Sequence, residues 1–326
     1  MSAPNNRAGL VIVFVLQLFG CGPAAFGHVP APPCELVVLG SGGPGATGRA
    51  ASSYLVLIKG VARILVDAGP GAFARLGEAR ISLANADVVL LTHLHIDHAG
   101  ELPGLFKARA VSSAGPIEFS VFGPDGSQAQ DHGAYFPSTR RLLDVLFGPQ
   151  GAFAYLSEFS APMTIHAHDI STRVSTDPMP HVILNDGAFA ITAIAGHHGD
   201  APAVIYRVDS AGGSITFSGD IDAKGLPSLL KIAKSSDLLV FNSAVLDPPG
   251  SPAILYTLHT PPHAIGELAR QAGVRGLLLS HLSPATATMH QAVLESIRQT
   301  YNGPVSWAED GMRLRPQPGD PQGSLP

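Results

Sequence analysis

The chain has 326 residues, of which 45% are hydrophobic and only 14% are charged, and its formal net charge at pH 7 is −5. This composition argues against nucleic-acid binding, which generally depends on clustered lysine and arginine. Two cysteines are too few for a disulfide framework. The length suffices for one large αβ domain, or for two halves that share a core.

Residues 1–27 have the features of an export signal. Arg7 supplies a positive charge, and the apolar run from Gly9 to Phe19 is too short to span a bilayer comfortably. A lipobox-like segment would make Cys21 the acylated N-terminus of a lipoprotein, whereas the small residues at 25–27 suit ordinary signal cleavage. Either scheme predicts a protein that is periplasmic or lipid-anchored to the cell envelope.

The rest of the chain divides into three parts. Residues 28–34 are predicted to form a proline-rich tether, residues 35–315 a folded domain, and residues 316–326 a flexible tail. Once the signal is removed or lipidated, Cys34 stands alone, so we do not expect thiolate ligands for a metal.

The domain begins with alternating strands and turns. Residues 35–39 predict a strand that ends in the glycine-rich segment 40–45, which we interpret as a tight turn because no Gly-Lys-Ser/Thr of a phosphate-binding loop follows. Residues 53–58 and 62–66 predict a hairpin that turns at 59–60.

Four polar residues follow the next apolar run. Residues 87–91 predict a buried strand, and the apolar spacing over 102–110 predicts a helix. The connection between them carries His93, His95, Asp97 and His98. Two histidines two positions apart in extended chain point the same way and can bind one cation, while the Asp-His pair suits a second cation close by.

The order His-x-His-x-Asp-His resembles the motif of the metallo-β-lactamase superfamily. The resemblance implies an α/β fold of the four-layer αβ/βα type, with a metal cleft at one edge of the sheets. It also implies that an aspartate at the end of the 62–66 strand braces the metal loop, a role that Asp67 takes by position.

In this family, further ligands follow downstream where buried strands end. The matching residues are His198 after 188–194, Asp220 after 214–218, and His281 after 276–280. The pattern His-Gly-x-x-Pro followed by Tyr-Arg favours His198, with His197 as the alternative. Asp220 could bridge two cations because its two oxygens carry separate lone pairs, although an aspartate in a turn or at a helix N-cap is the ordinary alternative.

The resemblance therefore implies two metal sites. One zinc would be bound by His93, His95 and His198, and the other by Asp97, His98 and His281, with Asp220 between them. Ligation by nitrogen and oxygen suits two Zn²⁺ ions, with Mn²⁺ or iron as alternatives. A second His-x-His-Asp, at His166 and His168, follows a simple strand alternation, and we interpret it as an exposed strand face.

Two metals about 4 Å apart hold a water between them and lower its pKa, so that a bridging hydroxide can attack an anionic ester. Asp97 is a candidate catalytic residue at this centre as well as a ligand. His259 resembles the His-Ser/Thr loop of ribonuclease Z-like members and is the candidate general acid. These features point to the ribonuclease Z-like branch, which includes phosphodiesterases and bacterial arylsulfatases.

We therefore expect an exported di-zinc hydrolase of sulfate or phosphate esters, acting on a small anionic substrate. Nucleic acid is not expected as a partner, because no inserted arm rich in lysine or arginine is found. Membrane contact is expected only through a lipid anchor, and the chain could form a homodimer. The alternatives are a ribonuclease Z-type endoribonuclease, a lactonase, and a non-catalytic zinc-binding lipoprotein.

Overall fold

The computed structural model describes residues 33–45, 47–127, 135–159, 162–173 and 177–318, all within the unit Pro32–Pro326. The predicted export signal, nearly all of the tether and the end of the tail lie outside the described residues. Across the described ranges, no helix is both long enough and apolar enough to cross a membrane.

The first sheet has seven strands: β1 (Cys34–Gly40), β2 (Ser53–Ile58), β3 (Val61–Ala68), β4 (Val88–Leu90), β5 (Ile117–Pro124), β6 (Met163–Ile170) and β14 (Arg313–Leu314). Their order is β14-β1-β2-β3-β4-β5-β6. The strands from β14 to β3 pair antiparallel, and those from β3 to β6 pair parallel. Cys34, which we expected in the tether, is instead the first residue of β1 because it pairs with Ile58.

The second sheet repeats this plan with β7 (His181–Asn185), β8 (Phe189–Ala195), β9 (Val204–Ser210), β10 (Gly213–Phe217), β11 (Leu238–Asn242), β12 (Leu277–Ser280) and β13 (Val305–Trp307). Its order is β13-β12-β11-β10-β9-β8-β7. The strands from β7 to β10 pair antiparallel, and those from β10 to β13 pair parallel.

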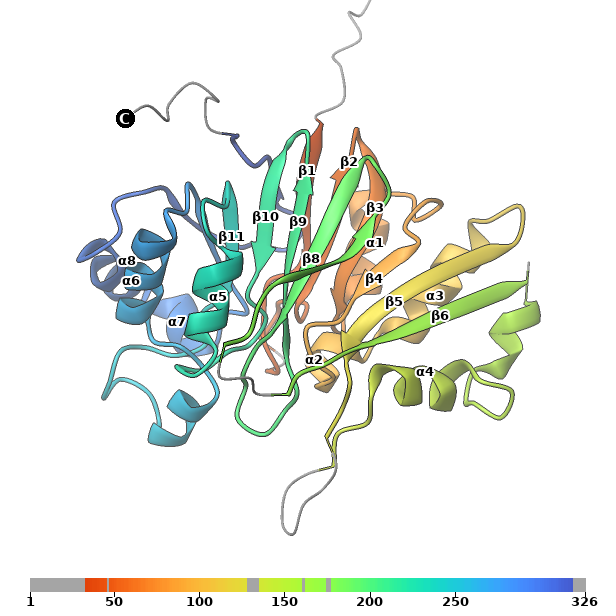
Figure 1. The fold of residues 1–326 in the computed structure, drawn as a ribbon, viewed down its shortest axis with the longest axis horizontal. Coiled ribbons are helices and arrows are strands. Elements are labelled where there is room, and N and C mark those ends of the chain that lie inside the picture. Colours follow the sequence, from red (N-terminus) through yellow and green to blue (C-terminus); the bar gives the residue numbers. More distant parts are fainter. Residues whose placement is uncertain (1–32, 46, 128–134, 160–161, 174–176, 319–326) are drawn as a thin grey trace, which may run out of the picture. The chain divides into compact units, whose positions relative to one another are not determined.

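Helices cover the outer face of each sheet. Those of the first half are α1 (Ala72–Ala79), α2 (Ile96–Ala99), α3 (Leu102–Val111), α4 (Thr139–Phe147) and the 3₁₀ helix η1 (Ala154–Glu158). Those of the second half are α5 (Leu226–Ile232), η2 (Ala253–Thr257), α6 (Pro262–Ala272), α7 (Pro284–Thr288) and α8 (His290–Arg298). Figure 1 shows the two sheets between α3 and α4 on one side and α5, α6 and α8 on the other, which is the expected four-layer α/β sandwich.

Side-chain alternation along the strands builds the layers. In β1, Leu36 and Val38 pack into the core between the two sheets, whereas Val37 and Leu39 pack against the helices. Strands buried on both faces have continuous apolar sequences, because neither face meets water. This explains why most of the strands could be found as short apolar runs.

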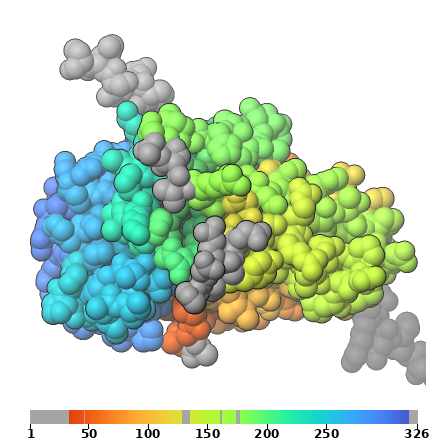
Figure 2. Space-filling model, turned by 60° about the horizontal axis from the view of Figure 1, so that its bottom comes forward, coloured from red at the N-terminus to blue at the C-terminus, as the bar shows by residue number. Residues whose placement is uncertain are grey.

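The connections between strands place polar residues at one edge of this sandwich. The predicted hairpin joins β2 to β3, with Lys59 and Gly60 at positive φ in its turn. The carboxyl ends of β4, β8, β10 and β12 lead to the segments that hold the predicted ligands. Figure 2 looks toward this edge, where the yellow-green surface of the first half meets the cyan and blue surface of the second.

Candidate metal centre

The His-rich segment leaves β4 and turns at once into a short helix. His95 is the N-cap of α2, and its carbonyl accepts hydrogen bonds from the backbone N–H groups of His98 and Ala99, each at 3.0 Å. Asp97 and His98 therefore lie in the short helix α2, whereas we expected them on the connection between the strand and the helix. This turn projects their side chains differently from those of His93 and His95.

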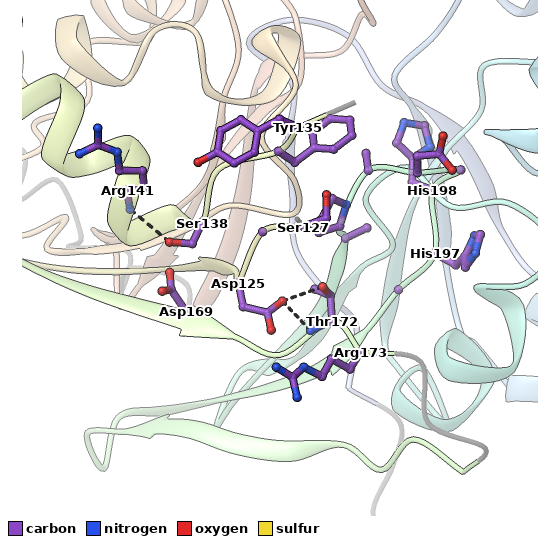
Figure 3. A pocket seen from close by; sticks show the side chains of 18 residues that line it. Asp125, Ser127, Tyr135, Ser138, Arg141, Asp169, Thr172, Arg173, His197 and His198 are labelled. Carbon is purple, nitrogen blue, oxygen red and sulfur yellow. Dashed lines mark hydrogen bonds between the residues drawn. The ribbon is translucent and has the colours of Figure 1, made fainter. Parts of the chain in front are cut away.

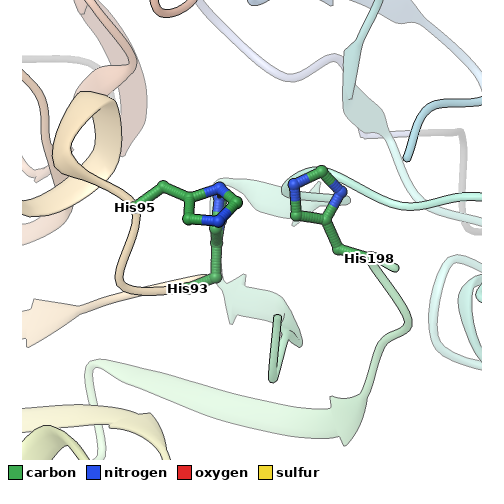
Figure 4. Close-up of side chains that lie close together, drawn as sticks. All are labelled: His93, His95 and His198. Atoms are coloured by element: carbon green, nitrogen blue, oxygen red, sulfur yellow. Dashed lines mark hydrogen bonds between the residues drawn. The ribbon is translucent and has the colours of Figure 1, made fainter. Parts of the chain in front are cut away.

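The first predicted ligand set comes together in the structure. Nε2 of His93 lies 3.0 Å from Nδ1 of His95, and the His198 ring centroid lies 4.9 and 5.1 Å from those of the two rings. One ring nitrogen from each of the three lies within 4.8 Å of the others. Figure 4 shows the three imidazoles facing one another from two separate parts of the chain.

The second predicted set lies beside the first. Asp97, His98, Asp220 and His281 are all buried, and their potential ligand atoms lie within 4.8 Å of one another. Nε2 of His281 is 3.1 Å from Oδ2 of Asp97 and 3.3 Å from Oδ2 of Asp220. All seven candidate ligands therefore gather in two adjoining groups.

Asp220 faces both groups with a single oxygen. Its Oδ2 lies 3.7 Å from Nε2 of His198 in the first group and 3.7 Å from Nε2 of His98 in the second. Its Oδ1 instead accepts a hydrogen bond of 2.6 Å from Nδ2 of Asn242, at the end of β11. The geometry therefore differs from the expectation of one oxygen for each cation, because Asn242 already occupies the second oxygen.

The candidate ligands come from both sheets. His93, His95, Asp97 and His98 follow β4 of the first sheet, whereas His198, Asp220 and His281 follow β8, β10 and β12 of the second. The carboxyl ends of these four strands open at the same edge of the sandwich. A short apolar run does not indicate to which of two facing sheets its strand belongs, so the sequence alone could not assign each ligand to a sheet.

Asp67 makes the contacts expected of a residue that braces the metal loop. Its Oδ1 accepts the backbone N–H of Thr92 at 2.8 Å, and its Oδ2 accepts the Thr92 hydroxyl at 2.8 Å. The same Oδ2 lies 2.8 Å from Nδ1 of His98. Asp67 thus fixes the orientation of the His98 ring and leaves Nε2 for the site.

His198 is placed for ligation and His197 is not. Nδ1 of His198 lies 2.7 Å from the carbonyl oxygen of Leu258, which leaves Nε2 facing Asp220. Nδ1 of His197 instead contacts the buried carboxylate of Asp222 at 2.8 Å, and His197 belongs to neither group. Asp222 also accepts the backbone N–H of Gly199, so it supports the His198 loop, a role that the sequence did not indicate.

His259, the candidate general acid, lies beside the two groups. Its Nδ1 is 3.9 Å from Oδ2 of Asp220, and its ring centroid lies 5.3 Å from that of His198 and 5.6 Å from that of His281. Burial lowers the pKa of His259 to about 4. The imidazole is therefore neutral at pH 7 and must receive a proton before it can donate one.

The chemistry of the donors fits two divalent cations. Burial, reinforced by the neighbouring His98, lowers the pKa of His93 well below its ordinary value, so His93 is a neutral imidazole with a free lone pair. Nε2 of His98 is buried and has no hydrogen-bond partner among the described residues, although a cation between Asp97 and Asp220 would satisfy it. Imidazole nitrogens with carboxylate oxygens suit zinc best.

Two further sequence features take the places expected of them. His166 and His168 lie on an exposed face of β6, as predicted, where His168 stacks on Phe122 at 4.5 Å. The glycine-rich turn after β1 reaches the site, because a Cβ at Gly43 would lie only 2.7 Å from Cε1 of His281. A side chain at position 43 would therefore displace a candidate ligand.

A cavity of about 760 Å³ opens beside His198 (Figure 3). Phe136, one of its lining residues, has its ring centroid 5.8 Å from that of His95, so the cavity continues into the first ligand group. Its charged lining residues include Arg141, Arg173, Asp125 and Asp169. The residues that line the cavity come from three segments, 125–141, 169–173 and 196–203.

The fold and these residues define a metal-dependent hydrolase of a known family. The chain belongs to the β-lactamase superfamily, because the model of the β-lactamase superfamily domain matches residues 62–282. The fold is the metallo-β-lactamase fold, whose members bind divalent metal ions.

Individual relatives point in the same direction. A protein named ribonuclease Z from Mycobacterium sp. (strain KMS) is 27% identical over 269 residues, which cover 79% of this chain and 87% of the relative. The human short-form tRNase Z has a similar fold, with a TM-score of 0.62, 22% identity, and coverage of 87% and 99% of the two chains. The metallo-β-lactamase fold protein YhfI from Bacillus subtilis gives a TM-score of 0.61 and 21% identity, over 86% and 99%.

Proposed function

We propose that this protein is a two-zinc phosphodiesterase. The position of Asp220 carries the proposal, because one buried oxygen faces His93, His198, His98 and His281 at 3.3–3.9 Å. A carboxylate oxygen placed between two sets of imidazoles is the geometry of a bridging ligand. When bound, two metals would supply an acidified water and would neutralise the oxygens of an anionic ester.

Two residues of the site are candidates for proton transfer. His259 lies against Asp220 at the rim of both groups and is the general-acid candidate for the departing oxygen. Asp97 contacts His281 at 3.1 Å and would be the candidate acceptor of the water's proton once metal is bound. Because the pKa of His259 is low, it would have to receive a proton within the site before it could donate one.

The cavity suits an ester with two substituents. A diester needs room on each side of the phosphorus, and the cavity extends from His198 and Phe136 toward Arg173. Within the described residues, Arg173 makes no ion pair, whereas Asp125 is occupied by Thr172 and Asp169 by Arg140. An unpaired guanidinium favours a substrate with negative charge beyond the scissile group.

Relatives named ribonuclease Z support phosphoric esters over sulfuric esters, since ribonucleases cleave phosphodiesters. The same relatives support RNA as a second candidate substrate, against our expectation from composition. A lactone or a sulfate ester has no such support, and a non-catalytic zinc protein would not need His259 against the bridging carboxylate.

A substrate panel tests this proposal. We expect the zinc-loaded protein to hydrolyse bis-p-nitrophenyl phosphate faster than p-nitrophenyl phosphate, p-nitrophenyl sulfate or an acyl lactone. An unstructured RNA added to the panel separates a nuclease from a small-molecule diesterase. Faster cleavage of the sulfate or of the lactone would contradict the proposal, and so would zinc binding without any turnover.

We also propose that the protein acts outside the cytoplasm, on the grounds of residues 1–27. Mass spectrometry of the mature protein would test this. A diacylglyceryl group on Cys21 supports a lipoprotein, an N-terminus near His28 supports ordinary cleavage, and an intact Met1 in the cytoplasmic fraction contradicts both. Light scattering of the purified protein would settle the expected homodimer.

A further inference from the structure

Two buried tyrosines cross the core between the sheets in opposite directions. Tyr54 belongs to β2 of the first sheet, and Tyr206 belongs to β9 of the second. They are 2% and 0% exposed, respectively, and both rings pack in the apolar core that the two sheets share. Each hydroxyl reaches a segment of the opposite sheet that leads directly into candidate metal ligands.

Tyr54 reaches the segment that holds His281. Its hydroxyl donates a hydrogen bond of 2.7 Å to Oγ of Ser280, the last residue of β12. The next residue, His281, has a φ of 53°, in the left-handed region that non-glycine residues rarely adopt. Such a conformation persists only where its surroundings enforce it, so a fixed Ser280 bears directly on the position of His281.

Tyr206 reaches the segment that leads to His93. Its hydroxyl donates a hydrogen bond of 3.1 Å to the carbonyl oxygen of Leu91. Two residues earlier on the same strand, the backbone N–H of Val204 donates to the carbonyl of Thr92 at 2.7 Å. The start of β9 therefore holds the two residues before His93 from the opposite sheet.

The hydroxyl groups are the informative part of these side chains. A phenylalanine would fill the same space in the core without a polar atom to bury, and burying a hydroxyl costs free energy unless it is hydrogen-bonded. Burial raises the pKa of both phenols well above the usual value, so both remain protonated donors over the whole physiological range. Each buried hydroxyl is therefore satisfied by the contact that it makes to the opposite sheet.

We propose that Tyr54 and Tyr206 are positioning residues of the metal centre, each holding the ligand-bearing segment of the opposite sheet in register with its own sheet. Tyr54 supports the group that contains His281, and Tyr206 supports the group that contains His93. This inference rests on the two-metal centre proposed above. It adds that each tyrosine affects zinc binding at one site more than at the other.

The test uses the full chain with Tyr54→Phe and Tyr206→Phe, which remove one hydroxyl each and keep the ring. Tyr301→Phe is the matched control, because Tyr301 is also buried and donates to a backbone carbonyl, that of Val274, within the helical layer of the second half. Zinc affinity at each site is measured by competition with a chelator, and the thermal midpoint of each apo-protein is recorded in parallel.

We expect Tyr54→Phe and Tyr206→Phe each to weaken one of the two zinc-binding steps by about tenfold, the lower end of losses seen for outer-shell partners of metal ligands. The two variants should affect different steps, and Tyr301→Phe should affect neither. Ser280→Ala should weaken the same step as Tyr54→Phe, and the double variant should lose little more than either single one.

Three results would overturn the inference: zinc affinities unchanged in both variants, equal loss at both sites, or the same loss in Tyr301→Phe. Unchanged affinities would mean that the hydroxyls only make hydrogen bonds in the core. Equal loss at both sites, or the same loss in Tyr301→Phe, would mean that the substitutions loosen the fold in general. Wild-type protein that binds two zinc ions without hydrolysing any diester would contradict the proposed function alone. Wild-type protein that binds no zinc would overturn both proposals.

Discussion

The two halves of the sandwich supply the same centre in different ways. The first half contributes four candidate ligands from six consecutive positions after one strand, whereas the second contributes three from the ends of three strands. A contiguous set is brought together by its own sequence and by the α2 turn, and Asp67 of β3 holds it in place. A dispersed set depends on the whole second sheet, since His198, Asp220 and His281 approach one another only when β8, β10 and β12 are correctly stacked.

This contrast has a consequence for metal binding. The first half carries His93, His95 and His98 on one short segment, but neither ligand group is complete without the second half, and β9 also holds the two residues before His93. Asp220 is the point where the two contributions meet. Substitutions in the second half should therefore lower zinc affinity at one site more than at the other. Substitutions in the first half should lower the affinity of ligands that the loop already holds close together.

The largest effect is expected from Asp220→Ala. Removing the oxygen that faces both groups should cost the second zinc ion and lower turnover by at least about 10²-fold. Metal analysis of the purified variant and its rate on bis-p-nitrophenyl phosphate measure the two losses. Asp209→Ala is the control, because Asp209 lies on the strand β9 and pairs with Arg207 instead. Two zinc ions and full activity in Asp220→Ala would refute the bridging assignment.

Substitutions at His198 and His197 compare neighbouring residues of the second half. His198→Ala removes a buried imidazole from the first ligand group, and we expect turnover to fall by orders of magnitude. His197→Ala removes only the contact with Asp222, and a fall of less than about tenfold is expected. The reverse order of the two effects, measured at saturating zinc, would move the ligand by one residue.

The same contrast explains which ligands could be predicted from the sequence. The first-half ligands could be recognised from their spacing alone, because neighbouring residues on a strand end must lie near one another. His198, Asp220 and His281 were predicted only through the resemblance to a known family. The contacts of Asn242 and Asp222 were not predicted at all, because a single polar residue more than 20 positions from its partner leaves no pattern.

The fold shows the same limit. Buried strands such as β4 and β12 were evident as apolar runs, and the hairpin was marked by its turn. β11 was not predicted, although it carries Asn242, and the sequence did not indicate which sheet carries each ligand. Which of two facing sheets a strand joins is decided by packing between layers, as in the Tyr206 contact with Leu91, and not by the strand's own residues.

His259→Ala tests the residue that lies between the two contributions. If His259 protonates the departing oxygen, the variant should keep both metals and lose about 10²–10⁴-fold in rate on esters with poor leaving groups. Esters with good leaving groups hardly need a proton and should lose much less. The comparison of p-nitrophenyl and alkyl esters measures this. An equal loss on both would mean that His259 positions the substrate or supports the loop.

Substitution of the supporting carboxylates, Asp67 and Asp222, should lower zinc affinity by amounts that differ less between the two halves. Asp67 contacts the His98 ring directly, whereas Asp222 supports the His198 loop through Gly199 and His197. We expect Asp67→Asn to weaken zinc binding by about 10–100-fold and Asp222→Asn by less. Chelator competition measures both, and a larger effect of Asp222→Asn would mean that the dispersed ligands depend more on their supports than the contiguous ones do.

The smallest effect is expected at the second His-x-His-Asp, on β6. His166 and His168 have the same spacing as His93 and His95, but they lie on an exposed strand face, where His166 lies 3.8 Å from Glu118. Among the described residues, neither belongs to a group that could bind a metal ion. His166→Ala and His168→Ala should each change zinc content and turnover by less than twofold, the change of about 0.4 kcal/mol expected for surface substitutions. The same spacing of two histidines should then have little effect on β6 and be essential after β4. Comparing the two histidine pairs therefore shows what the second sheet contributes to the site. A large loss in either variant would show that β6 takes part in the site through the cavity that Asp169 lines.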